Sequence, residues 1–519
     1  MKRKIVSAAE AAAKIPDGAV VAMSGVGIYD GIAQEVIDAV VARYEQEQHP
    51  SGISLVHSGG NMVANAFSKE GMLSAYYSGL PMIESDILTA NTYPAYSLTQ
   101  GIVQHLYRGQ ASDTPYVTKI GLGTFIDPRI EAGAINALAT ENPIVKLIVI
   151  DDEEYLYYKI PPITVSIIRA TTADADGNLT SEQEVMKNEL LYMAMAARNN
   201  GGIVIAQVKY IAETGSLKAA DVKVPGMLVD YVVSCTNHDK LHGPPMNAPF
   251  SLGMTGYHRV PDYMVPLKLY APDGDRLLAA RRAVTELRPG CVANVGIGMG
   301  EGVSYLASKE GLKDMFYLTN ELGAVSGHIG GKFFFGSSFN AYAYMNHPEM
   351  FDFINGHGLD MSFLGAAEIG EDGSVNVTKI NGKIKGSGGF VNISSSTPKI
   401  VFLSSFTIGG KNVIENGELK IIEPGRGGKF LKSVDQISFS GPDAAKRGQE
   451  ILYITERAVF KLIDGKVTLI EYASGLDVQK DILGFMDFVP AISPDLKTMP
   501  AYCFEGGPIG LKEEWKKQL

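Results

Sequence analysis

Cysteine and tryptophan are scarce in this chain, and long apolar runs are missing from it. The 519 residues include one tryptophan and three cysteines, Cys235, Cys291 and Cys503. The cysteines lie far apart, which excludes the CxxC spacing of a metal site and a disulfide framework. No run approaches the roughly 18 apolar residues that a membrane-spanning helix needs. These absences favour a reducing, cytoplasmic setting with structural thiols.

Positive charge is also in deficit. The net charge of -11 argues against broad binding of nucleic acid or anionic membrane, although a local basic pocket for a phosphorylated ligand stays compatible with it. The nine histidines form no ligand-spaced cluster, so the sequence predicts no metal. A Walker A loop and a Gly-x-Ser-x-Gly elbow are both missing. Ser7 with Glu10 has the pattern of a capping box and predicts an early helix.

Short apolar runs alternate with helix-like segments along the chain. They occupy residues 19–23, 53–57, 145–150, 202–208, 315–318 and 399–403. Runs of this length between helical patterns are typical of βαβ units and parallel sheets. The length alone suggests two to four domains.

An internal repeat is visible in the glycine pattern. Gly25, Gly27 and Gly31 follow one apolar run, and Gly296, Gly298 and Gly302 follow another at a constant offset. A repeat of this size predicts two similar open α/β domains with mainly parallel sheets, unless the glycine-rich turns coincide by chance. The boundary is expected within residues 237–275, which are rich in Pro, Gly, His and Asn, with a helix starting near 274–276. Residues 512–519 are expected to form a solvated tail.

Glu321 is the strongest candidate for a reactive residue. It comes directly after the apolar run that ends at Leu318 and just before Gly323 and Gly327. Ligands of open α/β sheets gather at the carboxyl ends of strands. The position therefore suits a nucleophile, and the alternative is an inert acid at a helix start.

Two further features each have a functional and a structural interpretation. The loop containing Gly296, Gly298 and Met299 precedes a helix and could present N–H groups to a phosphate or an oxyanion, or it could serve tight packing. Lys379, Lys383 and Lys385 lead into a second glycine loop with Gly388 and Gly389. Such lysines could meet phosphates, or they could belong to a solvated hairpin.

Several blocks together resemble family I coenzyme A transferases, of the fused single-chain type that includes acetate and propionate CoA-transferases. The blocks are residues 20–37, 120–129 (IGLGTFIDPR), 169–178 (RATTADADGN), 386–390 (GSGGF), 434–441 (VDQISFSG) and 454–460 (ITERAVF). Their order agrees with the family from about residue 7 to about residue 490. The family motif E-x-G-x-x-G-G is matched from Glu321 onward, except that Ser326 stands where the family has the first glycine of the final pair.

The resemblance implies the fold, the chemistry and the roles of particular residues. Residues 1–270 would form an α-subunit-like domain and residues 271–519 a β-subunit-like domain carrying the catalytic glutamate. Coenzyme A would move between an acyl-CoA and a short-chain carboxylic acid through a glutamyl-CoA thioester on Glu321. Oxyanion and CoA contacts would fall on Gly296, Gly298, Met299, Gly388 and Gly389, with CoA phosphates near Lys379, Lys383 and Lys385. No cofactor or metal is expected, nor a nucleic-acid or membrane partner, and the family suggests a cytoplasmic homodimer or homotetramer.

Three other functions stay open on the sequence alone. Water could replace the acceptor acid, which would make the chain an acyl-CoA hydrolase. Related folds also serve as effector-binding sensors and sugar-phosphate isomerases. The chain shows no helix-turn-helix extension or basic face for a DNA-binding sensor, and an isomerase would need an activity independent of CoA.

Overall fold

The computed structural model describes residues 4–25, 31–60, 62–235, 251–266, 271–331 and 336–518. The chain divides into two compact units. Unit 1 comprises Met1–Arg259, Tyr344–Asp352 and Lys383–Asn392, and unit 2 comprises Val260–Ala343, Phe353–Gly382 and Ile393–Leu519. Two short segments of the second half therefore belong with the first unit. The α- and β-subunit-like division at residues 270 and 271 stays a prediction.

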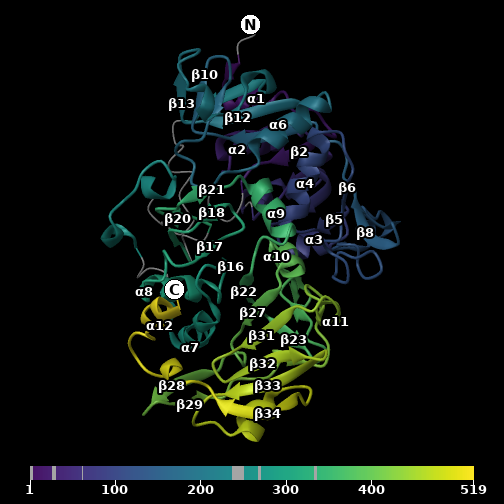
Figure 1. Cartoon of the computed structure of the whole chain (residues 1–519). Coiled ribbons are helices and arrows are strands. Elements are labelled where there is room, and N and C mark those ends of the chain that lie inside the picture. Colours follow the sequence, from purple (N-terminus) through teal and green to yellow (C-terminus); the bar gives the residue numbers. More distant parts are fainter. Residues whose placement is uncertain are drawn as a thin grey trace. The chain divides into compact units, whose positions relative to one another are not determined.

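Unit 1 is built on an eight-stranded sheet in which every neighbouring pair is parallel (Figure 1). The strand order is β1 (Ile5–Val6), β15 (Tyr231–Ser234), β12 (Ile203–Val208), β9 (Val165–Arg169), β2 (Val20–Met23), β3 (Ile53–His57), β4 (Leu73–Ser78) and β5 (Ala95–Ser97). The central strands β2, β3 and β9 are buried along their whole length. This is the pattern expected of a parallel sheet that is covered on both faces.

The remaining elements of unit 1 are helices and two small sheets. The helices are α1 (Ala8–Ala12), α2 (Gln34–Glu47), α3 (Ser85–Thr89), α4 (Gln100–Ala111), α5 (Ala137–Glu141) and α6 (Leu190–Asn199). One small sheet has the order β13 (Tyr210–Ala212), β10 (Thr172–Asp174), β11 (Leu179–Thr180) and β14 (Val222–Val224). The other has the order β6 (Tyr116–Thr118), β8 (Glu153–Tyr158) and β7 (Val145–Ile150). Ser7 and Glu10 form the predicted capping box at α1.

Unit 2 contains a larger, mixed sheet. The nine strands that lie wholly in this unit run in the order β18 (Ala324–Val325), β17 (Tyr317–Thr319), β16 (Val292–Val295), β22 (Met361–Gly365), β27 (Lys399–Leu403), β31 (Glu450–Ile454), β32 (Ala458–Ile463), β33 (Lys466–Tyr472) and β34 (Ala491–Thr498). Strands β17, β16, β22, β27 and β31 are parallel to one another. Strands β18, β32 and β33 run antiparallel to their inner neighbours, and β34 is parallel to β33.

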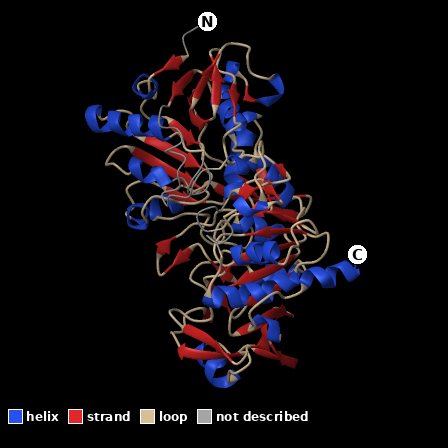
Figure 2. Ribbon diagram, turned by 90° about the vertical axis from the view of Figure 1, so that its left-hand side faces the viewer, coloured by secondary structure: helices blue, strands red, loops and turns tan. Residues whose placement is uncertain are grey.

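Figure 2 shows helices and strands intermixed in the structure. Helices and short strands complete the second half of the chain. The helices are α7 (Gly274–Ala283), α8 (Glu301–Lys309), α9 (His347–Asn355), α10 (Phe390–Ser396), α11 (Gly441–Lys446) and α12 (Leu511–Gln518). The short strands are β19 (His328–Ile329), β20 (Ser338–Phe339), β21 (Ala343–Tyr344), β23 (Glu368–Gly370), β24 (Val375–Asn376), β25 (Lys379–Ile380), β26 (Lys383–Ile384), β28 (Lys411–Glu415), β29 (Glu418–Glu423) and β30 (Phe430–Leu431).

Five central strands of the two sheets share one topology, which confirms the predicted repeat. Their order is β15-β12-β9-β2-β3 in unit 1 and β31-β27-β22-β16-β17 in unit 2, and all neighbours in both sets are parallel. Strand β2 therefore corresponds to β16, and β3 to β17. Of the first glycine loop, Gly25 and Gly31 are described, whereas Gly27 lies outside the described residues.

Most strand predictions were accurate to within one residue. Runs 53–57, 145–150 and 399–403 match β3, β7 and β27 without any shift, and 19–23 and 202–208 each begin one residue early. The run 315–318 is displaced, since the strand it predicted is Tyr317–Thr319. The predicted helix near 274 is α7.

The solvated tail predicted for residues 512–519 is wrong. Residues Leu511–Gln518 form α12, and the lone tryptophan, Trp515, is only 3% exposed. Its ring packs edge-on against Phe316, with 6.0 Å between ring centroids. The many charges of this helix cover its outer face, while Leu511 and Trp515, one turn apart, face the core of unit 2.

Candidate active site

Glu321 lies at the carboxyl end of β17, in a turn that leads back into the short strand β18. The turn is held by Asn320, whose Oδ1 accepts hydrogen bonds from the N–H groups of Leu322 and Ala324, each at 3.2 Å. Thr319 and Val325 pair across it in antiparallel fashion. The short loop therefore fixes the glutamate backbone at the edge of the sheet where parallel strands end, as the sequence predicted.

The Glu321 carboxylate is buried and incompletely paired. The residue is 8% exposed, and Oε2 has no hydrogen-bond partner among the described residues. Burial raises the pKa of this carboxyl from 4.5 to about 7, because the charged form loses water without gaining a counter-ion. Among the described residues, no hydrogen bond to Oε2 would compete with its attack on a substrate.

The residues that follow need left-handed backbone, which explains the glycine pattern and its one exception. Gly323 has φ 104° and Gly327 φ 76°. A Cβ added at Gly327 would lie 2.5 Å from the carbonyl oxygen of Phe339. Ser326 also has a positive φ, 57°, and is tied down because its N–H donates to the carbonyl of Leu318 at 2.6 Å. The serine that replaces the family glycine thus adopts the conformation that glycine favours, at some cost in strain.

The neighbouring strand β16 brings the predicted glycine loop to the same edge of the sheet. Asn294 pairs in register with Thr319, two residues before Glu321. The loop from Gly296 to Gly300 then enters α8. Because β16 and β17 are parallel neighbours, the loop and Glu321 both follow carboxyl ends that lie side by side.

The glycines of the loop and of the first turn of α8 are required for different structural reasons. A Cβ at Gly300 would lie 2.5 Å from the carbonyl oxygen of Phe363, and one at Gly302 would lie 2.7 Å from the Cβ of Ala280. These two glycines serve packing. Gly298 has φ 92° and nothing within 4 Å of an added Cβ, so its backbone conformation alone requires glycine. Within the described residues, the N–H groups of Gly298 and Met299 donate to no protein atom.

Asn294, on the strand beside β17, is a buried polar residue that the sequence analysis did not single out. It is fully buried, and neither its Oδ1 nor its Nδ2 has a partner among the described residues. A buried amide without partners costs roughly 1–3 kcal/mol. Its position in the strand next to Glu321 was hidden because a single Asn in an apolar run carries no signal of its own.

In unit 1, the second predicted glycine loop is docked onto the N-terminus of α4. The carbonyl of Gly388 accepts from Thr99 Oγ1 at 2.5 Å and from the N–H of Gln100 at 2.8 Å. Asn392 Oδ1 in turn lies 2.7 Å from Thr99 Oγ1 and accepts from the N–H of Gly101 at 3.1 Å. These contacts, which the sequence did not reveal, hold the loop in one conformation.

The two glycines of that loop are not equivalent as donors. The N–H of Gly388 is already used, since it donates to the carbonyl of Gly79 at 3.0 Å. For the N–H of Gly389, the described residues provide no acceptor. If the loop stabilises an oxyanion through the main chain, Gly389 is the residue with a free donor.

The three predicted lysines flank a turn. Lys379 is half-buried on β25, whereas Lys383 and Lys385 are exposed. Lys379 belongs to unit 2, and the other two belong to unit 1. Their role in holding CoA phosphates stays a prediction.

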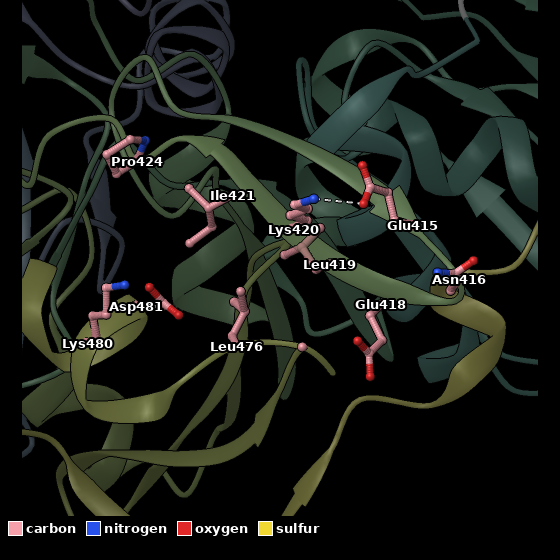
Figure 3. A pocket seen from close by; sticks show the side chains of 11 residues that line it. Glu415, Asn416, Glu418, Leu419, Lys420, Ile421, Pro424, Leu476, Lys480 and Asp481 are labelled. Carbon is pink, nitrogen blue, oxygen red and sulfur yellow. Dashed lines mark hydrogen bonds and ion pairs between the residues drawn. The ribbon is translucent and has the colours of Figure 1, made fainter.

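A separate hollow of about 540 Å³ in unit 2 contains none of the predicted site residues. It lies between the β28–β29 hairpin and the segment from Gly475 to Asp481 (Figure 3). Lys420 and Glu415 form an ion pair at 2.9 Å on its wall. No helix in the described part of the chain is long and apolar enough to cross a membrane.

The comparisons with known proteins show the family and the fold of the chain. The coenzyme A transferase family model matches residues 5–234. The caffeate CoA-transferase of Acetobacterium woodii is 41% identical over 515 residues, which cover 96% of this chain and 97% of that protein. The acetate CoA-transferase YdiF of Escherichia coli O157:H7 is 39% identical over 519 residues, covering 98% and 96%.

Solved structures give the same answer. The apoenzyme of the acyl-CoA transferase YdiF from E. coli O157:H7 has a TM-score of 0.91 at 38% identity and covers 98% of this chain and 97% of that chain. A thioester complex of the same protein with CoA has a TM-score of 0.90 at 37% identity, with the same coverage. The fold is thus that of the CoA-transferases. This chain belongs to the coenzyme A transferase family, and its enzymatic class is transferase, as its sequence predicted.

Proposed function

We propose that this enzyme moves coenzyme A from an acyl-CoA to a free short-chain carboxylic acid, with Glu321 as the covalent carrier. The observation that carries the proposal is the Glu321 carboxylate, buried at the end of β17 with one oxygen unpartnered. The relative YdiF, which has been crystallised as a thioester complex with CoA, supports a covalent route.

The reaction consists of two matched exchanges. A Glu321 oxygen attacks the thioester carbonyl. The C–S bond then breaks, which releases CoA as a thiolate and leaves a mixed anhydride between Glu321 and the donor acid. The thiolate then attacks the Glu321 carbonyl, the anhydride C–O bond breaks, and the donor acid leaves as a carboxylate. An acceptor carboxylate reverses both steps, so the kinetics are ping-pong and no proton is consumed.

The glycine loops have the chemistry to stabilise the tetrahedral states. Each addition develops a negative oxygen, and one preorganised donor to such an oxygen is worth roughly 3–4 kcal/mol. The free N–H groups of Gly298, Met299 and Gly389 are our candidates. Gly296 and Gly388 act by shaping their loops, and Lys379, Lys383 and Lys385 would hold the CoA phosphates.

The acid range of the proposal rests on resemblance. Acetate and propionate are the expected acceptors, and the relatives are named for acetate and for caffeate. A parallel assay with acetate, propionate and an aromatic propenoic acid ranks these classes directly. Preference for the aromatic acid would replace the short-chain assignment without affecting the role of Glu321.

Intact mass spectrometry tests the mechanism. After mixing with acetyl-CoA and no acceptor, we expect an adduct equal to CoA minus water, mapped to Glu321 and discharged by acetate. Consumption of acetyl-CoA without an adduct would instead identify a hydrolase. Intact acetyl-CoA and an unmodified protein with every donor tried would refute the proposal.

A further inference from the structure

The outer strand of the small sheet in unit 1 is an unusually apolar edge. Strand β7 (Val145–Ile150) ends the order β6-β8-β7, and Lys146 is its one charged residue. Val149 is 64% exposed and Ile150 45%. In Figure 1 the labels β6 and β8 of this sheet lie at the right-hand margin of the purple-to-blue part of the chain. An exposed hydrophobic edge strand is a site where another strand pairs.

The hydrogen-bonding direction of β7 follows from its inner partner. The N–H of Lys159 donates to the carbonyl of Ile144 at 2.9 Å, and residues 145–150 continue this antiparallel register along β8. Since bonded and non-bonded pairs alternate, the even-numbered residues bond to β8. Val145, Leu147 and Val149 therefore direct their N–H and C=O groups outward.

The same chain protects its other long edge. Strand β34 (Ala491–Thr498) ends the main sheet of unit 2 and is exposed along most of its length, but it contains Pro494, Asp495 and Lys497. Proline and charges on an edge strand prevent pairing with a second chain. On the outward residues of β7 no such protection exists.

A groove runs beside β7 on the face that carries Val145 and Leu147. It has a volume of about 850 Å³, and its walls carry the apolar Ile130, Ile135 and Pro143 together with charged and polar side chains, namely Arg129, Glu131, Asn136, Thr140 and Lys146. Ile130 is 43% exposed. An apolar strand edge thus lies beside a groove that has both apolar and charged walls.

Charge along β7 is distributed in a self-complementary way. Lys146 and the exposed Lys159 lie at its first end, while the turn of Asp151 and Asp152 lies at its last end. The adjoining Glu153 is already paired with Lys119, at 2.8 Å, and adds little to the acidic end. Antiparallel pairing of two copies sets the basic end of one against the acidic end of the other. Parallel pairing would oppose like charges.

We infer that β7 is a dimer interface between two copies of this chain, paired antiparallel about a two-fold axis through Leu147. In this register Val145 lies opposite the partner's Val149, and each pair of outward residues exchanges two main-chain hydrogen bonds. A two-fold axis normal to the sheet keeps side chains on the same face, so each exposed Val149 enters the groove of the other copy. The two β6-β8-β7 sheets become one continuous sheet. The interface is isologous, the commonest arrangement in homodimers, and uses no residue of the candidate active site.

Light scattering coupled to size exclusion tests the interface on the full chain. Val149→Lys places a charge in the interface, and we expect it to halve the mass of the native assembly. The variant should still unfold in a cooperative thermal transition, and its rate of CoA transfer per chain should stay within twofold of the wild type. The matched control is Ile492→Lys on the protected edge β34, where the replaced side chain is 45% exposed, against 64% for Val149. We expect it to leave the mass unchanged.

Cross-linking tests the register independently. Leu147→Cys lies on the proposed axis, and the paired Cα atoms would be about 5.5 Å apart, within disulfide range. We expect a covalent dimer on mild oxidation of Leu147→Cys, but none with Ile492→Cys, because β34 does not pair with a second copy. The three native cysteines are buried and should give no background cross-linking. A monomeric wild-type protein at micromolar concentration, an unchanged mass for Val149→Lys, or dissociation by Ile492→Lys instead would each overturn the inference.

Discussion

The buried charge of Glu321 should make this protein less stable than a neutral variant above neutral pH. Its pKa is raised from 4.5 to about 7 by burial, so the folded state holds a proton that the unfolded chain gives up. The free energy of unfolding therefore falls as pH rises from about 4.5 to about 7 and is then flat. At 1.36 kcal/mol per pKa unit, the ionised carboxylate costs up to about 3 kcal/mol at pH 8.

Glu321→Gln removes that charge while it keeps the shape of the side chain. At pH 8 we expect the variant to be more stable by up to about 3 kcal/mol, and at pH 4.5 to equal the wild type. For a unit of 150–250 residues, this corresponds to a rise in melting temperature of roughly 6–12 °C at pH 8. The variant should transfer no CoA, so stability and activity move in opposite directions.

Differential scanning calorimetry at pH 4.5, 6 and 8 measures the effect, with intact mass confirming that the glutamine has not deamidated. Glu505→Gln, at an exposed position of the same unit, is the control and should change little at any pH. The reasoning is refuted if Glu321→Gln destabilises the protein at pH 8. An equal rise in melting temperature at pH 4.5 and at pH 8 would also refute it, because an effect of side-chain packing would not depend on the ionisation of Glu321.

Four further outcomes follow from the structure. The rate of thioester formation on Glu321 should fall about tenfold per pH unit below pH 7, because only the carboxylate attacks. A rate that stays flat down to pH 5, measured by rapid quenching and intact mass spectrometry, would contradict this. Gly298→Ala should lower transfer at least ~10-fold by displacing an N–H donor, whereas Gly290→Ala, also left-handed and with open space around it, should cost similar stability and no activity. Thr99→Val should loosen the Gly388 loop and lower kcat by roughly tenfold with unchanged melting; rescue by Thr99→Ser would separate the hydroxyl from packing. Trp515→Ala should destabilise unit 2 by about 3–5 kcal/mol in urea titration, and a loss below 1 kcal/mol would mean that α12 is only loosely attached.

Sequence alone predicted the sheet centres and the position of Glu321 after a buried strand, for one reason. Strands such as β3 and β27 are apolar along their whole length because both faces are buried, and a carboxylate directly after such a strand stands out. The boundary of β17 was displaced because Met315 and Phe316 are apolar for another reason, namely packing in the core near α12. The tail was misjudged because its charges outnumber its apolar residues, although two apolar residues one turn apart are enough to anchor a short helix.

The contacts that hold the site were beyond sequence reasoning, since they join residues distant in the chain. Thr99 and Asn392 meet at Gly388 across nearly 300 positions, and no local pattern marks a threonine as a loop anchor. Asn294 gave no signal because it interrupts a strand as an isolated polar residue. Such residues are recognised only when their partners, or the lack of partners, can be examined in three dimensions.

Glycine shows most clearly what a structure adds to a motif. In the segment from Gly296 to Gly302, which comprises the loop and the start of α8, the sequence could not separate packing from ligand binding. Gly300 and Gly302 have neighbours that leave no room for a Cβ, while Gly298 has room and needs only a left-handed backbone. A left-handed residue between a strand and a helix turns its neighbouring N–H groups away from both elements, which is how main-chain anion sites form. Among the described residues, the unused donors at Gly298 and Met299 and the unpaired oxygen of Glu321 follow adjacent strand ends. This arrangement supports the proposed reaction, in which the carboxylate would attack and the donors would receive the charge that the attack creates.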